Sequence, residues 1–257
     1  MLPNSDIGVV IPTHNRAELT ARAVDSVLNQ VVKPRQIVIV DDGSSKIELA
    51  KLKNLVSGET IQIIESEAVR HPGILRNIGV RLLHTNWVAF LDSDDVWLPD
   101  KLLIQLAYAE ANKAEAICSN GYLLEEKIGP IEYLKINNAN KIINTKQLLR
   151  KNLIINSSVL IKKDLLESIG GVSESYLVRG VEDYATWLRV STKVKWHLIN
   201  QPLVKYNSTQ TDSISHTFGY QHYSFFSAIL DFKYWQYKKS LFRRKLFSIT
   251  LKFVSRF

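Results

Sequence analysis

Three carboxylates lie within four positions of one another in the stretch FLDSDDVWLPDK, which covers residues 90–101. Only Ser93 separates Asp92 from Asp94, and Asp95 follows directly. Like charges this close repel and raise each other's pKa. Carboxylates at a strand end can hold Mg²⁺ or Mn²⁺, which take one or two of them together with substrate phosphates. The alternative is a solvated turn, or Asp95 as the cap of a helix with Pro99 in its first turn.

Two more polar clusters follow apolar runs in the same way. They are PTHNR at residues 12–16 and DDGSS at residues 41–45. The backbone groups and polar side chains of PTHN could hold a base or a phosphate. DDGSS, taken alone, is equally well a plain strand-to-helix turn, because Asp, Gly and Ser are common turn residues.

The hydrophobic pattern explains how these clusters could meet. Short β-branched runs alternate with segments whose apolar residues recur at helical spacing. The expected strands cover 7–12, 36–40, 60–65 and 86–91, and the expected helices cover 17–30, 47–56, 73–84 and 99–112. Such alternation predicts a parallel sheet with helices on both faces. Ligands of open sheets bind beyond the carboxyl ends of the strands, so all three clusters should share one edge.

The second half of the chain is less regular. We expect strands at 157–163, 195–199 and 203–207 and helices at 164–171 and 182–192, whereas 119–145 is polar and gives no assignment. The organisation predicted is one domain, 1–207, with a nucleotide-binding half at 1–118 and an acceptor-side half at 119–207. Residues 208–257 form a separate extension.

Composition narrows the class of protein. The 257 residues allow a sizeable core, and the single cysteine, Cys118, is expected to be a small buried residue. We expect neither a signal peptide nor a transmembrane helix, since no long apolar run occurs. The sequence also lacks a G-x-G-x-x-G stretch after the first strand, a G-x-x-x-x-G-K-[ST] loop and a Cys/His cluster, which argues against dinucleotide, P-loop and zinc sites.

Several motifs occur together in a characteristic order. They are VVIPTHNRAELTARAVDSVLNQ, IVIVDDGSS, RNIGVR, FLDSDDVW and GVEDYATWLR. In this the sequence resembles inverting family 2 glycosyltransferases of the GT-A fold over residues 7–207. The resemblance implies a mostly parallel, Rossmann-like sheet with helices on both faces, followed here by a C-terminal helical extension.

The resemblance also implies site residues. Asp41 would accept a hydrogen bond from the base, Arg76 would lie near the diphosphate, and the D-x-D motif would bind the donor and its metal. The implied nucleotide-sugar-binding residues are Pro12, Thr13, His14, Glu18, Asp41, Arg76, Asp92 and Ser93. The implied metal ligands for Mn²⁺ or Mg²⁺ are Asp94 and Asp92, with His216 as a further candidate that could equally be structural or exposed.

The catalytic base implied by the resemblance is Asp183 in GVEDYATWLR. A carboxylate within reach of the acceptor hydroxyl removes its proton, and a metal neutralises charge on the leaving diphosphate. The alternative is that the acids of GVED only favour a helix N-terminus. Asn156 and Ser157 could contact the acceptor, or could simply be polar loop residues.

The formal net charge is +8, and positive charge gathers toward the C-terminus. Eight Lys and Arg residues lie between Lys233 and Arg256, and no acid follows Asp231. Aromatic residues interleave with them, and the pattern is that of a basic amphipathic helix at an anionic membrane surface. The alternative is a surface helix docked on the domain. Nucleic acid is not expected as a partner, because no nucleic-acid module accompanies the charge.

The function predicted is transfer of a sugar from a nucleotide-diphosphate sugar, with a UDP-sugar favoured, to a glycan or lipid-linked acceptor. The family's usual setting is bacterial surface-polysaccharide assembly, on the cytoplasmic face of the inner membrane. Two competing functions are a nucleotide-sugar-binding protein with a degenerate site and a sugar-1-phosphate nucleotidylyltransferase. The latter needs a glycine-rich loop that PTHNRAE lacks.

Overall fold

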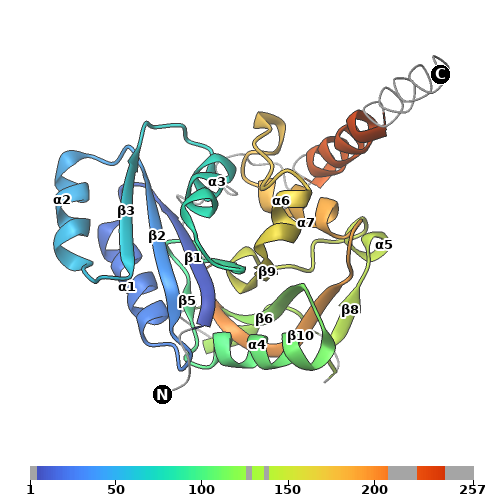
Figure 1. The fold of residues 1–257 in the computed structure, drawn as a ribbon, viewed down its shortest axis with the longest axis horizontal. Coiled ribbons are helices and arrows are strands. Elements are labelled where there is room, and N and C mark those ends of the chain that lie inside the picture. The colour runs from blue at the N-terminus through green and yellow to red at the C-terminus, as the bar shows by residue number, and fades with distance from the viewer. Residues whose placement is uncertain (1–4, 126–128, 136–138, 208–224, 241–257) are drawn as a thin grey trace, which may run out of the picture.

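A computed structural model describes residues 5–125, 129–135, 139–207 and 225–240. One mixed sheet with helices on both sides forms the body of the molecule (Figure 1). The strands are β1 (Ser5–Thr13), β2 (Pro34–Asp42), β3 (Ile61–Ser66), β4 (Trp87–Phe90), β5 (Val96–Trp97), β6 (Ala116–Glu125), β7 (Gly129–Glu132), β8 (Lys141–Ile143), β9 (Leu160–Lys162) and β10 (Trp196–Tyr206). The helices are α1 (Ala17–Leu28), α2 (Lys46–Leu55), α3 (Pro72–Leu82), α4 (Lys101–Asn112), α5 (Thr145–Leu148), α6 (Lys163–Ser168) and α7 (Glu182–Val190), with short 3₁₀ turns η1 (Asn156–Ser158) and η2 (Tyr176–Val178). A further helix covers 225–240.

The first half of the sheet has the predicted architecture. The strand order is β3-β2-β1-β4, and every pairing in this part is parallel. The four strands and four helices expected from the sequence all form, with boundaries that differ by two residues or fewer at nearly every end. The carboxyl ends of β1, β2 and β4 therefore share one edge of the sheet.

The second half differs from a parallel sheet. The order continues β9-β6-β10-β5, and β9 pairs antiparallel with both β4 and β6. Residues 195–207, expected as two strands, form the single strand β10, which pairs parallel with β6. The unassigned polar stretch contributes β6, β7 and β8. β6 and β8 pair with β10, which lies far away in the sequence, so local patterns did not reveal them, whereas β7 pairs with its sequence neighbour β6.

Two hydrophobic clusters pack against opposite faces of the sheet. Along β4 and the next residue the side chains alternate, with Val88 and Phe90 in one cluster and Ala89 and Leu91 in the other. Helices α3, α6 and α7 cover the first face, and α1, α2 and α4 cover the second (Figure 1). The period of two is that of strands buried on both faces. The first cluster also contains Trp187, so it joins both halves of the chain.

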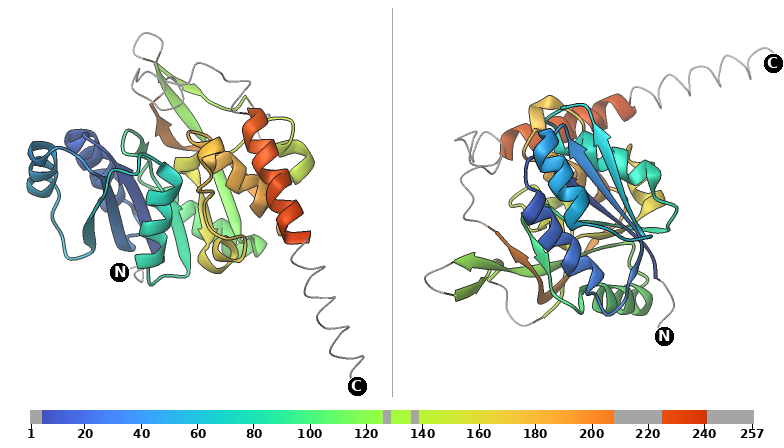
Figure 2. Two further views of the ribbon diagram at one scale, coloured as in Figure 1. Left: turned by 90° about the horizontal axis from the view of Figure 1, so that it is seen from above. Right: turned by 90° about the vertical axis from the view of Figure 1, so that its left-hand side faces the viewer.

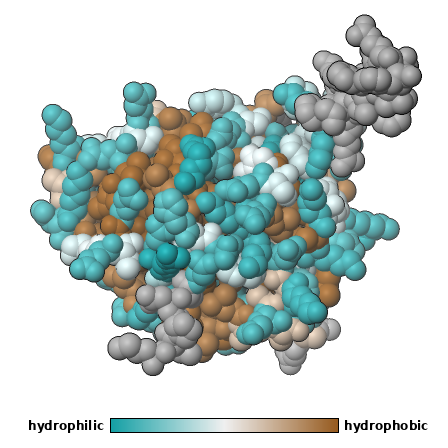
Figure 3. Space-filling model, in the orientation of Figure 1, coloured by the Kyte–Doolittle hydropathy of each residue, from teal (hydrophilic) through white to brown (hydrophobic). Residues whose placement is uncertain are grey.

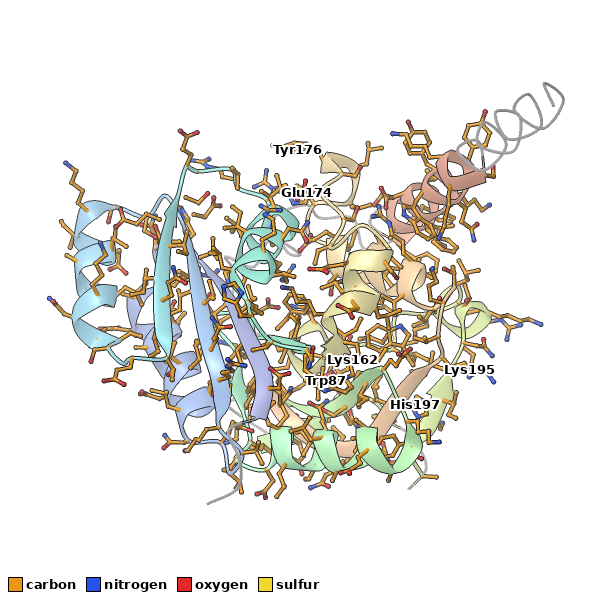
Figure 4. The ribbon with its side chains drawn as sticks, viewed as in Figure 1. Trp87, Lys162, Glu174, Tyr176, Lys195 and His197 are labelled. Atoms are coloured by element: carbon orange, nitrogen blue, oxygen red, sulfur yellow. The ribbon has the colours of Figure 1, made fainter. Side chains whose placement is uncertain are left out.

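Helix α3 lies unusually close to its neighbours. A Cβ on Gly79 would meet Val10 Cγ1 at 2.4 Å, and a Cβ on Gly73 would meet Ser173 O at 2.2 Å. Asn77 donates from Nδ2 to Glu174 Oε1 at 2.8 Å, in the region where Figure 4 labels Glu174. Gly79 is therefore kept inside the helix by packing, because only hydrogen fits there.

The helix at 225–240 docks on the domain through one face (Figure 2). Phe225 stacks on Tyr184 with ring centroids 5.6 Å apart, and Trp235 donates from Nε1 to Ile169 O at 3.2 Å. Asp231 is buried and pairs with Arg189 at 2.7 Å. The inner face of the helix at 225–240 is therefore docked on the domain. Residues 241–257, which contain most of the predicted basic amphipathic pattern, lie outside the described residues.

The outer face of the same helix is apolar as well as basic. Its exposed large hydrophobic residues are Phe226, Leu230, Tyr234 and Tyr237. In the part of the chain that the structure describes, no helix is long and apolar enough to cross a membrane. On the face of the molecule seen in Figure 3, hydrophilic side chains project around the outline and hydrophobic residues gather between them.

Candidate active site

A cavity of about 300 Å³ lies at the carboxyl ends of β1, β2 and β4. All three polar clusters reach it, as the fold predicted. Its lining from the first half includes Pro12, Thr13, His14, Arg16, Asp42, Arg70, Arg76, Asp92, Ser93 and Asp94, and from the second half Gly180, Glu182, Asp183, Tyr206 and Asn207. The two halves of the chain thus build one site together.

Hydrogen bonds hold the first two clusters together at the rim. His14 Nδ1 lies 2.9 Å from Asp42 O, and because a carbonyl can only accept, this nitrogen carries the proton. His14 Nε2 then accepts from Asn15 Nδ2 at 3.1 Å. Asn15 has a positive φ of 50°, and its Oδ1 accepts from the Ser45 amide at 2.8 Å. The imidazole ring therefore has a fixed orientation.

The three carboxylates of the acidic turn have different surroundings. Asp95 is 1% exposed and accepts hydrogen bonds from Ser157 Oγ and, at 3.0 Å, from the Asn207 amide. Burial, followed by the charges of Asp92 and Asp94, raises its pKa well above the usual value. Asp95 thus ties the turn to η1 and β10. The proposed helix-cap role is wrong, since Asp100 is the N-cap residue of α4.

Asp92 and Asp94 instead face the cavity, and each is paired with an arginine. Asp94 Oδ2 lies 3.0 Å from Arg16 Nη1. Asp92 Oδ1 accepts from Arg76 Nη2 at 2.7 Å and from Asn156 Nδ2 at 2.9 Å. Burial and the charge of Asp92 raise the pKa of Asp94 despite Arg16. A cation placed between these carboxylates would relieve that repulsion.

Arg76 links the acidic turn to the second half of the chain. It is 5% exposed, and its Nη1 lies 2.6 Å from Glu182 Oε1 while its Nη2 binds Asp92. The other oxygen of Glu182 accepts from the Gly180 amide at 2.6 Å. Arg76 lines the cavity as expected, but two carboxylates already engage its guanidinium.

Asp183 lies in the first turn of α7 and is partly exposed at the cavity. Its Oδ1 accepts from the Tyr184 amide at 2.7 Å. Burial, with the neighbouring charge of Glu182, raises the pKa of Asp183 to about 7, although Arg76 opposes the shift. A carboxylate with such a pKa suits general base catalysis near neutral pH.

Comparisons with known proteins agree with this geometry. The model of the family described as Glycosyl transferase family 2 matches residues 8–170. The chain belongs to glycosyl transferase family 2.

Individual relatives are similar over different lengths. An uncharacterized glycosyltransferase of Rickettsia bellii is 31% identical over 112 residues, which are 44% of this chain and 16% of that protein. The chain therefore spans only a small part of that relative. The O-antigen biosynthesis glycosyltransferase WbnJ of Escherichia coli is 28% identical over 218 residues, 82% of this chain and 84% of WbnJ.

Among solved structures, S. aureus TarS residues 1–349 in complex with UDP-GlcNAc superpose with a TM-score of 0.67 at 15% identity, covering 81% of this chain and 60% of that one. At this identity the likeness concerns the fold. It confirms the GT-A type of fold predicted from the sequence.

Two residues assigned by the family resemblance do not line the cavity. The Glu18 side chain is 76% exposed on α1 and pairs with Lys51 at 2.8 Å. Asp41 is 1% exposed, and its carboxylate accepts hydrogen bonds from the Ser44 amide and hydroxyl. Asp42 lines the cavity instead and accepts from the Val69 amide at 2.8 Å.

The remaining family assignment, His216, lies outside the described residues. In the described part of the chain, no group of three or more His, Cys, Asp or Glu residues could hold a metal ion. Among the described residues, Asp92 and Asp94 are the two implied metal ligands, and both line the cavity.

Sequence reasoning missed several lining residues. Arg16 lies in PTHNR and Glu182 lies in GVED. The two motifs were recognised, but these two residues were not predicted to line the cavity. Tyr206 and Asn207 line the cavity because they lie at the end of β10, and no sequence motif indicated that they would. Asn156 and Ser157, weighed as acceptor contacts, both hydrogen-bond to Asp92 of the acidic turn.

Proposed function

We propose that this protein transfers a sugar from a nucleotide-diphosphate sugar, with a UDP-sugar favoured, to a hydroxyl of a glycan or lipid-linked saccharide, with inversion at the anomeric carbon. One observation carries the proposal. A single cavity is lined by Asp92 and Asp94 from the first half of the chain and by Asp183 from the second. Such a displacement needs one acidic site for the leaving diphosphate and a separate carboxylate for the acceptor proton.

Asp183 acts as the general base in this proposal. The acceptor oxygen forms a bond to the anomeric carbon on the face opposite the diphosphate, while the bond from that carbon to the diphosphate oxygen breaks. The hydroxyl proton passes to the Asp183 carboxylate, whose pKa of about 7 allows it to accept a proton near neutral pH. One displacement of this kind inverts the anomeric configuration.

Asp94 and Asp92 would hold Mn²⁺ or Mg²⁺. The fit rests on two cavity-facing carboxylates, and burial, followed by the charge of Asp92, raises the pKa of Asp94. The ion would neutralise charge on the leaving diphosphate. Arg16 and Arg76 hold the two carboxylates in place at 3.0 Å and 2.7 Å.

The carboxyl end of β1, together with the residue that follows it, is the proposed nucleoside contact. Pro12, Thr13 and His14 line the cavity, and the His14 ring is fixed by its contacts with Asp42 and Asn15. Asp42 replaces Asp41 as the lining acid of the second cluster. A fixed ring and nearby backbone groups suit the recognition of a planar base.

Surface-polysaccharide assembly is the proposed setting, as the O-antigen name of a similar protein suggests. We also propose that the C-terminal extension holds the enzyme at an anionic membrane on the cytoplasmic side. The exposed face of the helix at 225–240 combines aromatic residues with Lys233 and Lys238, and further basic residues follow in the sequence. Flotation with phosphatidylglycerol vesicles should recover the protein at low salt, whereas binding to phosphatidylcholine vesicles alone would contradict the electrostatic part.

The central test is thermal unfolding with nucleoside diphosphates and nucleotide-sugars, each with and without Mn²⁺. Ligands that bind the native state raise the melting temperature. We expect a metal-dependent rise for one base in the wild type and in Asp25→Asn, an exposed acid on α1, and loss of the metal dependence in Asp94→Asn. Folded protein that responds to no nucleotide would point to a degenerate site and refute the transferase.

A further inference from the structure

Two tyrosines meet beside the candidate base. Tyr206 ends β10 and lines the cavity with Asp183. Tyr133 follows β7, and its amide donates to Gly121 O at 2.8 Å on the neighbouring strand β6. The two ring centroids are 5.8 Å apart, and the ring planes are inclined at 58°. We call Tyr133 and Tyr206 the tyrosine pair.

The tyrosine pair has buried and acidic surroundings. Burial is the largest reason why the pKa values of both phenols are raised, and the charge of Asp183 raises each of them further. Asp95 and Asp92 also act on Tyr206. The placement itself is geometric, because Tyr206 lines the same cavity as Asp183 and the ring of Tyr133 contacts that of Tyr206.

The tyrosine pair keeps aromatic surface accessible. Tyr133 is 40% exposed, and Tyr206 is partly exposed at the cavity. Neither ring is among the described residues of the two hydrophobic clusters of the core. Aromatic rings with an apolar face and a polar hydroxyl, set beside a polar cavity, are typical of ligand sites.

The position of the tyrosine pair indicates which part of the substrates the two rings can contact. The base takes the proton of the acceptor hydroxyl that attacks the anomeric carbon, and the nucleobase lies beyond the diphosphate and ribose from that carbon. A ring next to Asp183 therefore meets a sugar and not the nucleobase. A pyranose chair carries hydroxyls around its rim and C–H groups on its faces, so it can pack on an aromatic ring and still hydrogen-bond.

From these observations we infer that the tyrosine pair is an acceptor subsite, which binds the C–H face of the pyranose ring whose hydroxyl reaches Asp183. The inference rests on the proposed function and extends it to the acceptor. It assigns Tyr206 to the inner wall of the subsite and Tyr133 to its outer, more exposed wall.

Saturation-transfer NMR on the full chain tests the subsite. The probes are the methyl glycosides of glucose, galactose and N-acetylglucosamine, each measured with and without UDP and Mn²⁺. Irradiating the aromatic protons should transfer saturation to the pyranose C–H protons of at least one probe. Tyr133→Ala and Tyr206→Ala should each weaken its binding about three- to tenfold, whereas the Phe variants should retain it.

Tyr234→Ala on the outer face of the helix at 225–240 is the matched control and should bind as the wild type does. Tyr133 is exposed enough that its Ala variant should fold even if Tyr206→Ala does not. Absence of transfer in wild-type protein that shows the nucleotide-dependent thermal shift would overturn the subsite alone. Tyrosine variants that lose affinity for the nucleotide-sugar but keep that for the glycosides would also overturn it, because the pair would then contact the donor. Failure of the nucleotide shift itself would instead overturn the proposed function.

Discussion

Asp183 and Glu182 are adjacent acids that the structure directs to different partners. The Glu182 side chain is 4% exposed and held by Arg76, whereas Asp183 reaches the cavity with a raised pKa. A base must be ionised to accept a proton. The rate should therefore depend on pH in a way that identifies Asp183.

We predict that kcat/KM falls about tenfold per pH unit below pH 7, since the ionised fraction of a group with a pKa of about 7 falls in that way. Asp183→Asn should abolish transfer and preserve the thermal shift caused by nucleotide and Mn²⁺. Steady-state rates from pH 5.5 to 8.5, with nucleotide binding measured at each pH, check this. A flat profile, or loss of nucleotide binding in Asp183→Asn, would exclude Asp183 as the base.

Stability should respond to the same group. Because the folded pKa of about 7 exceeds the ordinary 3.8, folding favours the protonated form of Asp183. The contribution of Asp183 to the free energy of unfolding is therefore greatest at low pH, and it is lost as the pH rises through 7. Asp183→Asn should thus melt a few degrees above the wild type at pH 8 and at the same temperature near pH 4. Equal differences at both pH values would show that the carboxylate is not perturbed.

Arg76 is the second residue whose environment makes a strong prediction. Its removal would leave Glu182, 3% exposed, without its charge partner and Asp92 without one of its two donors. Arg76→Met should lower the free energy of unfolding by about 3–5 kcal/mol, the usual cost of breaking a buried ion pair. Urea unfolding measures this, with the exposed ion-pair variant Lys53→Met as a control that should change little.

At the scale of elements, α3 shows packing overriding helix propensity. Alanine favours an isolated helix over glycine by about 1 kcal/mol, so propensity alone predicts that Gly79→Ala stabilises the protein. The Cβ would lie 2.4 Å from the buried Val10 side chain, and overpacking of that kind costs about 1–3 kcal/mol. We expect net destabilisation in chemical unfolding, and partial recovery in Gly79→Ala combined with Val10→Ala. A more stable single variant would show that α3 is free to move away from β1.

At the scale of the whole molecule, the helix at 225–240 belongs to the folded domain as much as to the extension. Asp231 pairs with Arg189 at 2.7 Å and lies 3.2 Å from Ser173 Oγ, and all three side chains are buried. Asp231→Ala should lower the free energy of unfolding by about 3–5 kcal/mol, because Arg189 would remain buried without a carboxylate. Lys233→Ala, exposed on the same helix, should change it by less than about 0.5 kcal/mol. Equal effects in thermal unfolding would mean that the helix does not dock as described.

The sequence alone determined the first half of the molecule and the edge at which its polar clusters meet. Parallel strands buried on both faces are short apolar runs, and the helices between them carry their own periodicity, so local patterns are sufficient there. The order of the motifs determined the family, and the sheet edge brought His14, Asp92 and Asp94 to one cavity.

Only the tertiary structure decided how the second half completes the site. β6 and β8 are defined by pairings with the distant strand β10, β7 pairs with its sequence neighbour β6, and the polar stretch gives no local sign of them. The same is true of single residues: Asp95 turns inward to Ser157 while Asp92 meets Arg76, and nothing in DSDD distinguishes them. Burial and partners that are distant in the sequence determine whether a side chain is ionised and which groups it contacts. Both are set by the fold, so local sequence patterns do not reveal them.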